Sequence, residues 1–158
     1  MIWTVALPEL VLAVGVMALL MLGVFRGNKS TDMVGLLSAL LLVVVLVLSL
    51  TNDTGVAFDG LFIEDQFTGF VKVLVLVGSA VAVLMAIEYC RREDMQRFEY
   101  PILMAVAALG MLMMVSANDF IALYMGIELQ SLSLYVLAAF RRDALRSTEA
   151  GLKYFVLG

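Results

Sequence analysis

The sequence contains no histidine and only one cysteine, Cys90, which belongs to no CxxC motif. Cysteine thiolates hold iron–sulfur clusters, and histidine is a common ligand of haem and zinc. The chain therefore cannot ligate an iron–sulfur cluster alone, offers no histidine to a haem or a zinc ion, and forms no internal disulfide. Any redox chemistry associated with it must take place in another chain.

Charge is also scarce. Only 15% of the 158 residues are charged, whereas 63% are hydrophobic, and the mean hydropathy is +1.05. This exceeds the apolar content that a soluble domain of this size needs. The net charge of −4 does not suit nucleic acid, which requires clustered lysine and arginine. We therefore expect an integral membrane protein in contact with the lipid bilayer.

The apolar runs predict an all-α, polytopic helix bundle with five complete transmembrane helices and the start of a sixth. A spanning helix needs about 20 predominantly apolar residues. The predicted spans cover residues 4–25, 33–51, 67–89, 100–117, 120–140 and, in part, 148–158. The last run is too short to cross, so we expect a single membrane domain over residues 1–158 that is incomplete at its C-terminus.

The sequence near the ends of the first three spans allows three further predictions. We expect Glu9, at the start of the first span, to lie at the membrane interface. The longest connection contains Asp59-Gly60 between apolar residues, which predicts a small β-hairpin over Val56–Ile63. Lys72 lies within two turns of the start of the third span. This proximity favours a lysine that snorkels back to the interface, and a polar role inside the membrane is the alternative.

The basic residues are distributed unevenly among the loops. Eight of the ten lie in three alternate connections: Arg26, Lys29, Arg91, Arg92, Arg97, Arg141, Arg142 and Arg146. The loops on the other side hold five acids and no base: Asp53, Asp59, Glu64, Asp65 and Asp119. Cytoplasmic loops are enriched in lysine and arginine. The pattern therefore predicts a cytoplasmic location for the three basic loops and an N-terminus outside the cytoplasm.

The fifth predicted span carries an acid, Glu128, eight residues inside its start at Phe120. An acid at such a depth costs roughly 2.5–3.5 kcal/mol on insertion scales, so it needs a partner, water or a proton. Helical spacing places Tyr124, Ser131 and Tyr135 on the same face, which predicts that this polar face looks into a protein interior. Glu128 is by default a functional-site candidate, and the alternative is a protonated acid that joins helices.

Lys153 is the second candidate. It follows Glu149 by four residues, so the two can pair on one helix face, and it lies close enough to the membrane interface to snorkel. Alternatively, lysine and glutamate in an apolar interior suit a proton relay, because burial and a neighbouring opposite charge shift their pKa values in opposite directions. The residues alone leave both interpretations open.

Several stretches resemble a known family. The segment GIELQSLSLY at 126–135, combined with EAGLKYFVLG at 149–158, is similar to the subunit N family of the proton-pumping NADH:quinone oxidoreductase, respiratory complex I. LPEL at 7–10 and FIEDQFTGFVK at 62–72 resemble the start and the third helix of the same family. The resemblance therefore runs the full length of the chain.

The resemblance implies part of an antiporter-like, fourteen-helix subunit that translocates protons in the bacterial cytoplasmic membrane, with a periplasmic N-terminus. Glu128 matches the family's fifth-helix glutamate and Lys153 its sixth-helix lysine; Lys72, Tyr124, Ser131 and Tyr135 are possible accessory polar residues. The family pairs the glutamate with a seventh-helix lysine, which this chain does not reach.

The implied partners are protons and the other membrane-arm subunits of the complex. No cofactor is expected in this chain, and FMN, iron–sulfur clusters and quinone would lie in other subunits. Two alternatives remain open: a subunit of a multisubunit cation/proton antiporter, and a membrane scaffold or assembly subunit without a transport role.

Overall fold

The computed structural model describes residues 5–27, 31–51, 54–57, 60–92, 99–139 and 145–157. These residues form helices joined by short connections and one small β-hairpin. In chain order the elements are α2 (Leu7–Arg26), α3 (Thr31–Thr51), β1 (Gly55–Ala57), β2 (Phe62–Glu64), α4 (Gln66–Arg92), α5 (Glu99–Ser116), α6 (Phe120–Ala138) and α7 (Leu145–Leu157).

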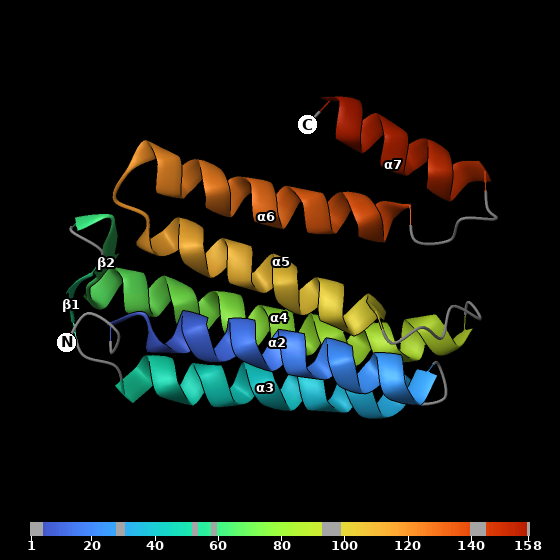
Figure 1. Ribbon diagram of the computed structural model, residues 1–158, viewed down its shortest axis with the longest axis horizontal. Coiled ribbons are helices and arrows are strands. Elements are labelled where there is room, and N and C mark those ends of the chain that lie inside the picture. Colours follow the sequence, from blue (N-terminus) through green and yellow to red (C-terminus); the bar gives the residue numbers. More distant parts are fainter. Residues whose placement is uncertain are drawn as a thin grey trace.

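The helices run alternately up and down, so their ends gather at two opposite sides of the bundle (Figure 1). Helix α5 packs against α2, α3, α4 and α6, whereas α7 packs mainly against α6. Among the described residues, the five helices from α2 to α6 are long and apolar enough to cross a membrane. This confirms the predicted all-α membrane class.

The predicted spans and the observed helices agree to within a few residues. The first predicted span starts at residue 4, outside the described part, and α2 starts at Leu7. The third span is longer than predicted, since α4 continues to Arg92. The sixth helix begins at Leu145 rather than at residue 148. The predicted end of the fifth span at residue 140 lies outside the described residues.

The core of the bundle lies among α2, α3, α4 and α5. Fully buried aliphatic side chains from these four helices meet there: Leu12, Leu42, Val45, Leu76, Val83 and Leu112. Many large apolar side chains point outward instead, among them Phe25, Phe70 and Met85. Helices that are apolar both on the face toward the core and on the outer face are expected where lipid rather than water surrounds the protein.

Helices α5 and α6 approach each other closely because both carry glycine at the contact. A Cβ added at Gly110 would lie 2.7 Å from the backbone nitrogen of Gln130, and one added at Gly126 would lie 3.0 Å from that of Met114. Small residues allow transmembrane helices to pack backbone against backbone. The helix that carries Glu128 is therefore held to α5 by glycine packing.

The predicted hairpin is present. Strands β1 and β2 pair antiparallel, with Val56 opposite Ile63. Gly60 adopts a φ of 90°, a conformation that residues with a Cβ rarely take, which explains the glycine in this connection. Asp59, the other residue of the predicted turn, lies outside the described residues.

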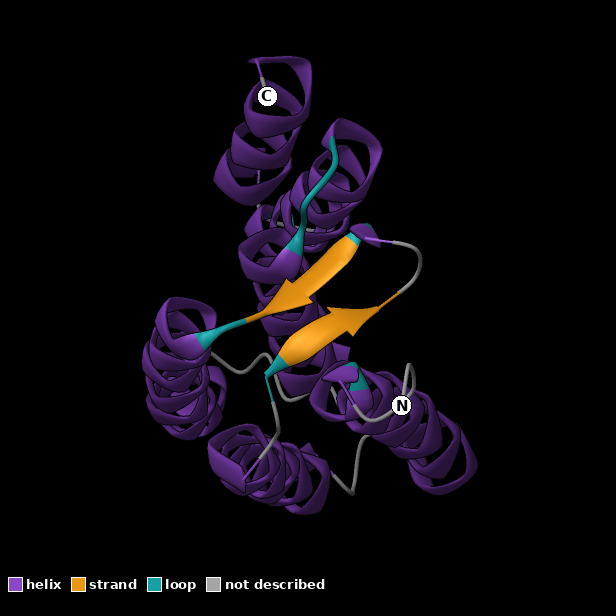
Figure 2. Cartoon of the chain, turned by 90° about the vertical axis from the view of Figure 1, so that its left-hand side faces the viewer, coloured by secondary structure: helices purple, strands orange, loops and turns teal. Residues whose placement is uncertain are grey.

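The hairpin lies across the ends of the helices on the side where α4 and α6 begin (Figures 1 and 2). Phe62 forms a β-bridge with Ala117 in the connection between α5 and α6. Next to it, the backbone N–H of Asn118 donates to the carbonyl of Leu61 at 3.0 Å, and its side-chain amide donates to the carbonyl of Gly60 at 2.8 Å. These bonds fix β2 over the end of the bundle.

Candidate functional site

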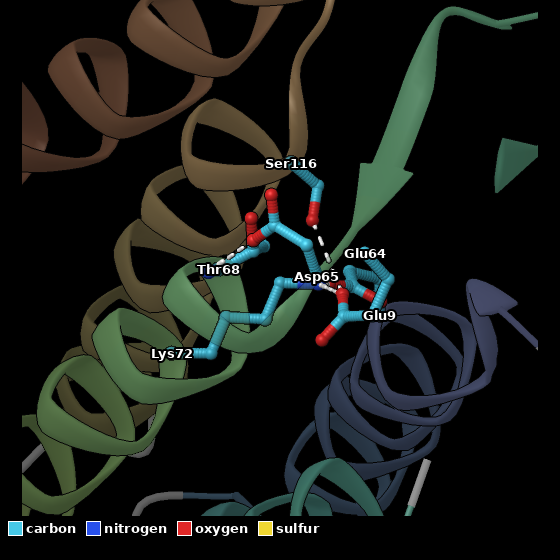
Figure 3. Close-up of polar contacts among 6 residues, drawn as sticks. All are labelled: Glu9, Glu64, Asp65, Thr68, Lys72 and Ser116. Carbon is cyan, nitrogen blue, oxygen red and sulfur yellow. Dashed lines mark hydrogen bonds and ion pairs between the residues drawn. The ribbon is translucent and has the colours of Figure 1, made fainter. Parts of the chain in front are cut away.

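A cluster of charged side chains lies beneath the hairpin, inside the bundle (Figure 3). The ammonium group of Lys72 is ion-paired with both Glu9 and Glu64. Lys72 has 0% of its surface exposed, Glu9 has 6% and Glu64 has 4%. The three residues therefore form a buried triad of two carboxyls and one amine, which we call the hairpin-end triad.

The triad draws one residue from each of three segments that are far apart in the sequence. Glu9 lies in the first turn of α2, directly after Pro8. Proline is tolerated at a helix start because the backbone N–H that it lacks would have no partner within the helix there. Glu64 is the last residue of β2, and Lys72 lies in the second turn of α4. The antiparallel arrangement brings these ends together, and the hairpin directs Glu64 back toward α2 and α4.

Two further contacts reach the triad. The hydroxyl of Ser116, the last residue of α5, donates to Glu64 Oε2 at 3.4 Å. The ammonium of Lys72 also lies 4.8 Å from the centre of the Phe62 ring, within the range of a cation–π interaction. The triad is thus contacted by α2, α4, α5 and the hairpin.

The residue beside Glu64 has a different role. Asp65 accepts a hydrogen bond of 2.7 Å from the backbone N–H of Thr68 and so caps the start of α4. This hydrogen bond lowers the pKa of Asp65 below its ordinary value, because it stabilises the carboxylate form. Asp65 is exposed, whereas its neighbour Glu64 is buried, because the backbone alternates direction at the end of the strand.

The buried triad overturns one expectation and adds to another. Lys72 does not snorkel to the interface but points into the bundle, since two carboxylates compensate the cost of burying its charge. Glu9, expected at the membrane interface, is buried within the protein against Lys72, and its depth relative to a membrane stays a prediction. Glu64 lies only eight residues before Lys72 in the sequence, but no local pattern identified either Glu64 or Glu9 as the partner of Lys72.

The predicted site residues on α6 are less buried than the triad. Glu128 is half-buried and, among the described residues, makes no ion pair or side-chain hydrogen bond. Tyr124 is 63% exposed, and Ser131 is half-buried. Within the described chain, α5 packs on the opposite, glycine-bearing face of α6, and α7 contacts the polar face at Tyr135. The expectation that this polar face looks into a protein interior stays a prediction.

Tyr135 belongs to a separate contact between α6 and α7. Its ring lies edge-on to Tyr154 at 4.6 Å and to Phe155 at 5.6 Å between centroids. Tyr135 and Gly151 also line a groove of about 750 Å³ that is mostly apolar. The aromatic contacts attach α7 to the second half of α6.

Lys153 lies on the exposed face of α7, with 69% of its side chain exposed in this chain. It pairs with Glu149 at 2.9 Å, one turn earlier, which confirms the pairing predicted from the spacing. Within the described residues no ion pair joins Lys153 to Glu128. The structure therefore does not bring these two predicted site residues into contact.

Within the part of the chain that the structure describes, no group of three or more histidine, cysteine, aspartate or glutamate side chains is placed to hold a metal ion. In the triad the position between the two carboxyls is occupied by the ammonium of Lys72.

Among the described residues, five apolar helices long enough to cross a membrane, with a buried cluster of charged residue types near one end, define a multi-spanning membrane protein. Comparison with known proteins narrows this class. The family described as NADH:quinone oxidoreductase/Mrp antiporter, TM, matches residues 117–158, which include Glu128 and Lys153.

Curated relatives match almost the whole chain. It is 60% identical over 154 residues to NADH-quinone oxidoreductase subunit N of Paramagnetospirillum magneticum, a match that covers 96% of this chain and 32% of the relative. It is 54% identical over 154 residues to subunit N 1 of Rhizobium meliloti, with 97% and 32% covered. The chain is thus similar along nearly its full length to subunit N, and spans about a third of the length of these relatives.

A solved structure supports the same relationship. Respiratory complex I from Thermus thermophilus with bound aureothin contains a chain that superposes with a TM-score of 0.77 at 30% identity. The match covers 95% of this chain and 32% of that one. The antiporter-like fold inferred from the sequence resemblance is therefore confirmed for the described helices.

Proposed function

We propose that this chain is part of a membrane-arm, antiporter-like subunit of a proton-pumping NADH:quinone oxidoreductase. The observation that carries the proposal is its 60% identity, over 96% of its length, to a protein named as subunit N of that enzyme. Its partners are the other membrane-arm subunits and the lipid bilayer. NADH oxidation and quinone reduction take place in other subunits with their FMN and iron–sulfur clusters, and this subunit moves protons in response.

Glu128 is the residue to which we assign the proton-carrying role within α6. It lies in the middle part of a helix long enough to span the membrane, yet no described side chain neutralises it. An acid in this position must be neutralised by a proton or by a cation from outside the described part, because an unpaired charge inside a membrane is costly. A group whose protonation depends on a movable partner is suited to carrying protons.

Lys153 is proposed as the neighbouring group of the same path, with Lys72, Tyr124, Ser131 and Tyr135 as accessory polar residues. Its exposed position on α7 supports this role only in combination with further protein, because within this chain its partner is Glu149. An amine that exchanges one carboxylate partner for another changes its proton affinity. This is the property that a relay requires.

The test is to measure protons pumped per NADH oxidised in membrane vesicles from Glu128→Gln and Glu128→Asp strains. We expect strong loss of pumping for the glutamine variant, which cannot titrate, and partial loss for the aspartate variant, which keeps the charge with a shorter reach. Glu88→Gln, a change of an exposed acid on α4, is the matched control and leaves pumping normal.

Assembly of the complex is measured separately by native electrophoresis. Normal pumping in a fully assembled Glu128→Gln variant contradicts the proton-carrying role. Lost assembly in that variant favours the scaffold alternative, in which Glu128 only joins helices.

A cation/proton antiporter is a second candidate, because the description of the matching family also includes Mrp antiporters. The two functions differ in their dependence on NADH. Sodium-dependent proton exchange in vesicles that lack NADH supports the antiporter, whereas pumping that requires NADH oxidation supports the oxidoreductase.

We further propose that the chain lies in the bacterial cytoplasmic membrane with its N-terminus and hairpin on the periplasmic side. The uneven distribution of basic residues supports this orientation. After removal of Cys90, the variants Asp59→Cys and Gln96→Cys are exposed in intact cells to a thiol reagent that cannot cross membranes. We expect labelling at position 59 only, and labelling at position 96 alone would reverse the orientation.

A further inference from the structure

The hairpin-end triad contains more acid than base. Glu9 and Glu64 face the single ammonium group of Lys72, and all three side chains are more than nine-tenths buried. If both carboxyls were ionised, the triad would carry one negative charge without a partner. Burying an unpaired charge in an apolar interior is costly enough that such groups take up a proton instead.

The described elements around the triad supply no second cation. Helix α5 contributes the hydroxyl of Ser116, and Asp65 beside the triad is an acid that faces outward and bonds Thr68. The positive end of α2 lies near Glu9, but a helix N-terminus is equivalent to only roughly +0.5 elementary charge. The missing positive charge is therefore most readily supplied by a proton.

The two carboxyls differ in how well their oxygens are satisfied. Glu64 Oε2 receives hydrogen bonds from both Lys72 and Ser116. Glu9 is ion-paired with Lys72 through Oε1, but both of its carboxyl oxygens are buried and neither has a hydrogen-bond partner among the described residues. A carboxylate oxygen without a donor is the less stable position for negative charge, so Glu9 is the carboxyl that holds the proton.

A pocket lies beside Glu64, between the end of α3 and the start of α4. It has a volume of about 320 Å³, and Glu64, Asp65, Thr54 and Ser49 are among the residues that line it. The hydroxyl of Ser49 is buried and has no partner among the described residues. Most of the lining is apolar, but the pocket is large enough for water, and the carboxyl-bearing side chains of Glu64 and Asp65 at its wall are potential partners through which water can carry protons to Glu64.

We propose that Glu9, Lys72 and Glu64 form a proton-binding site that holds one exchangeable proton on Glu9 and exchanges it with water through the pocket beside Glu64. The proton passes along the ion pairs, from the pocket to Glu64 and across Lys72 to Glu9, without any change in covalent bonding between heavy atoms. This goes beyond the proposed function, because proton binding by the triad requires no transport by Glu128 or Lys153.

The experiment is infrared difference spectroscopy of the full-length protein in its assembled, reconstituted complex, compared among wild type, Glu9→Gln, Glu64→Gln and the control Glu88→Gln. Glutamine has the shape of a protonated glutamic acid but cannot release a proton. Subtracting the Glu9→Gln spectrum from that of wild type isolates the carboxyl of Glu9.

At neutral pH we expect this difference to contain the carbonyl band of one protonated carboxyl, which shifts in heavy water and disappears at alkaline pH. The band is also lost in Glu64→Gln, because Glu9 is then the only carboxyl left to pair with Lys72 and becomes ionised. The Glu88→Gln difference contains carboxylate bands only.

Two results overturn the proposal. One is a difference between wild type and Glu9→Gln that shows only carboxylate bands at neutral pH, which would mean that Glu9 is ionised. The other is failure of Glu9→Gln to assemble while Glu64→Gln assembles, because an amide that mimics the protonated acid must be tolerated at Glu9.

Discussion

The two ends of the described chain hold their charged residues in opposite ways. At the hairpin end, Glu9, Lys72 and Glu64 are buried and find their partners on different elements. On α6 and α7, Glu128 is half-buried without an ion pair among the described residues, and Lys153 pairs on the exposed surface of its own helix. Among the described residues, the charged groups of the first site pair with one another across elements, whereas Glu128 and Lys153 do not pair.

The difference shows how much the surroundings of a charge decide its importance for stability. An exposed pair such as Lys153–Glu149 loses most of its Coulomb energy to water and contributes between zero and about 1 kcal/mol. Removing one member of a buried ion pair leaves a charge that nothing compensates, which costs about 3–5 kcal/mol. Changes at the triad should therefore affect the fold far more than changes at Lys153.

The largest effect is expected for Lys72→Met. Removing the only cation of the triad leaves two buried acids without a counter-charge, and we expect a loss of about 3–5 kcal/mol in stability. The measurement is the thermal unfolding midpoint of the purified full-length protein in detergent. Lys153→Met is the matched control, and an equal shift for both lysines would remove the distinction between the two ends.

A smaller loss of stability is expected for Gly110→Ala, at the contact between α5 and α6. Gly110→Ala places a Cβ 2.7 Å from the backbone of Gln130, and because a backbone atom cannot rotate away the helices must separate. We expect a loss of about 1–3 kcal/mol, typical of overpacking. Thermal unfolding checks this as well.

The control for this change is Gly78→Ala on α4, where an added Cβ meets nothing within 4 Å. Because alanine favours helices over glycine, this variant should be unchanged or more stable by about 0.5–1 kcal/mol. Equal destabilisation of both variants would show that glycine packing does not position α6.

The next smaller effect on stability is expected at Asp65, which caps the start of α4 next to Glu64 of the triad. Asp65→Ala removes the acceptor of the Thr68 N–H and should lower the unfolding midpoint by less than either change above, whereas Asp65→Asn keeps an acceptor. Because the pKa of Asp65 is lowered in the folded protein, its ionised form stabilises the fold above the ordinary aspartate pKa. This contribution is lost as the pH falls through the lowered value.

Unfolding midpoints measured across acid pH should therefore converge for wild type and Asp65→Asn below the ordinary aspartate range. A constant gap between the two proteins at every pH would mean that the charge of Asp65 does not contribute.

The smallest effect is expected for Glu149→Gln. Its partner Lys153 lies on the same exposed helix face, and such a pair contributes about 0.3–0.5 kcal/mol. The unfolding midpoint should change little, and even this small change should vanish at high salt. A shift comparable to that of Lys72→Met would show that Lys153 is buried in the full-length protein.

Local patterns were sufficient for much of the fold. The apolar runs predicted five spans because every backbone group in a bilayer must be satisfied within a helix, and the Asp59-Gly60 pair predicted the hairpin because glycine permits the required φ. The pairing of Glu149 with Lys153 followed from helical spacing alone. These features depend on residues that are close together in the chain.

The burial of Lys72 depends instead on tertiary structure. Glu9 and Lys72 are 63 residues apart in the sequence, and their contact exists only because α2 and α4 begin at the same end of the bundle, where the hairpin adds Glu64 between them. A lysine near a span end is equally compatible with snorkelling until opposite charges are found within reach. The sequence thus determined the helices, the hairpin and the local ion pair, whereas tertiary packing decided which charges are buried together, because burial and long-range pairing depend on neighbours that no local pattern identifies.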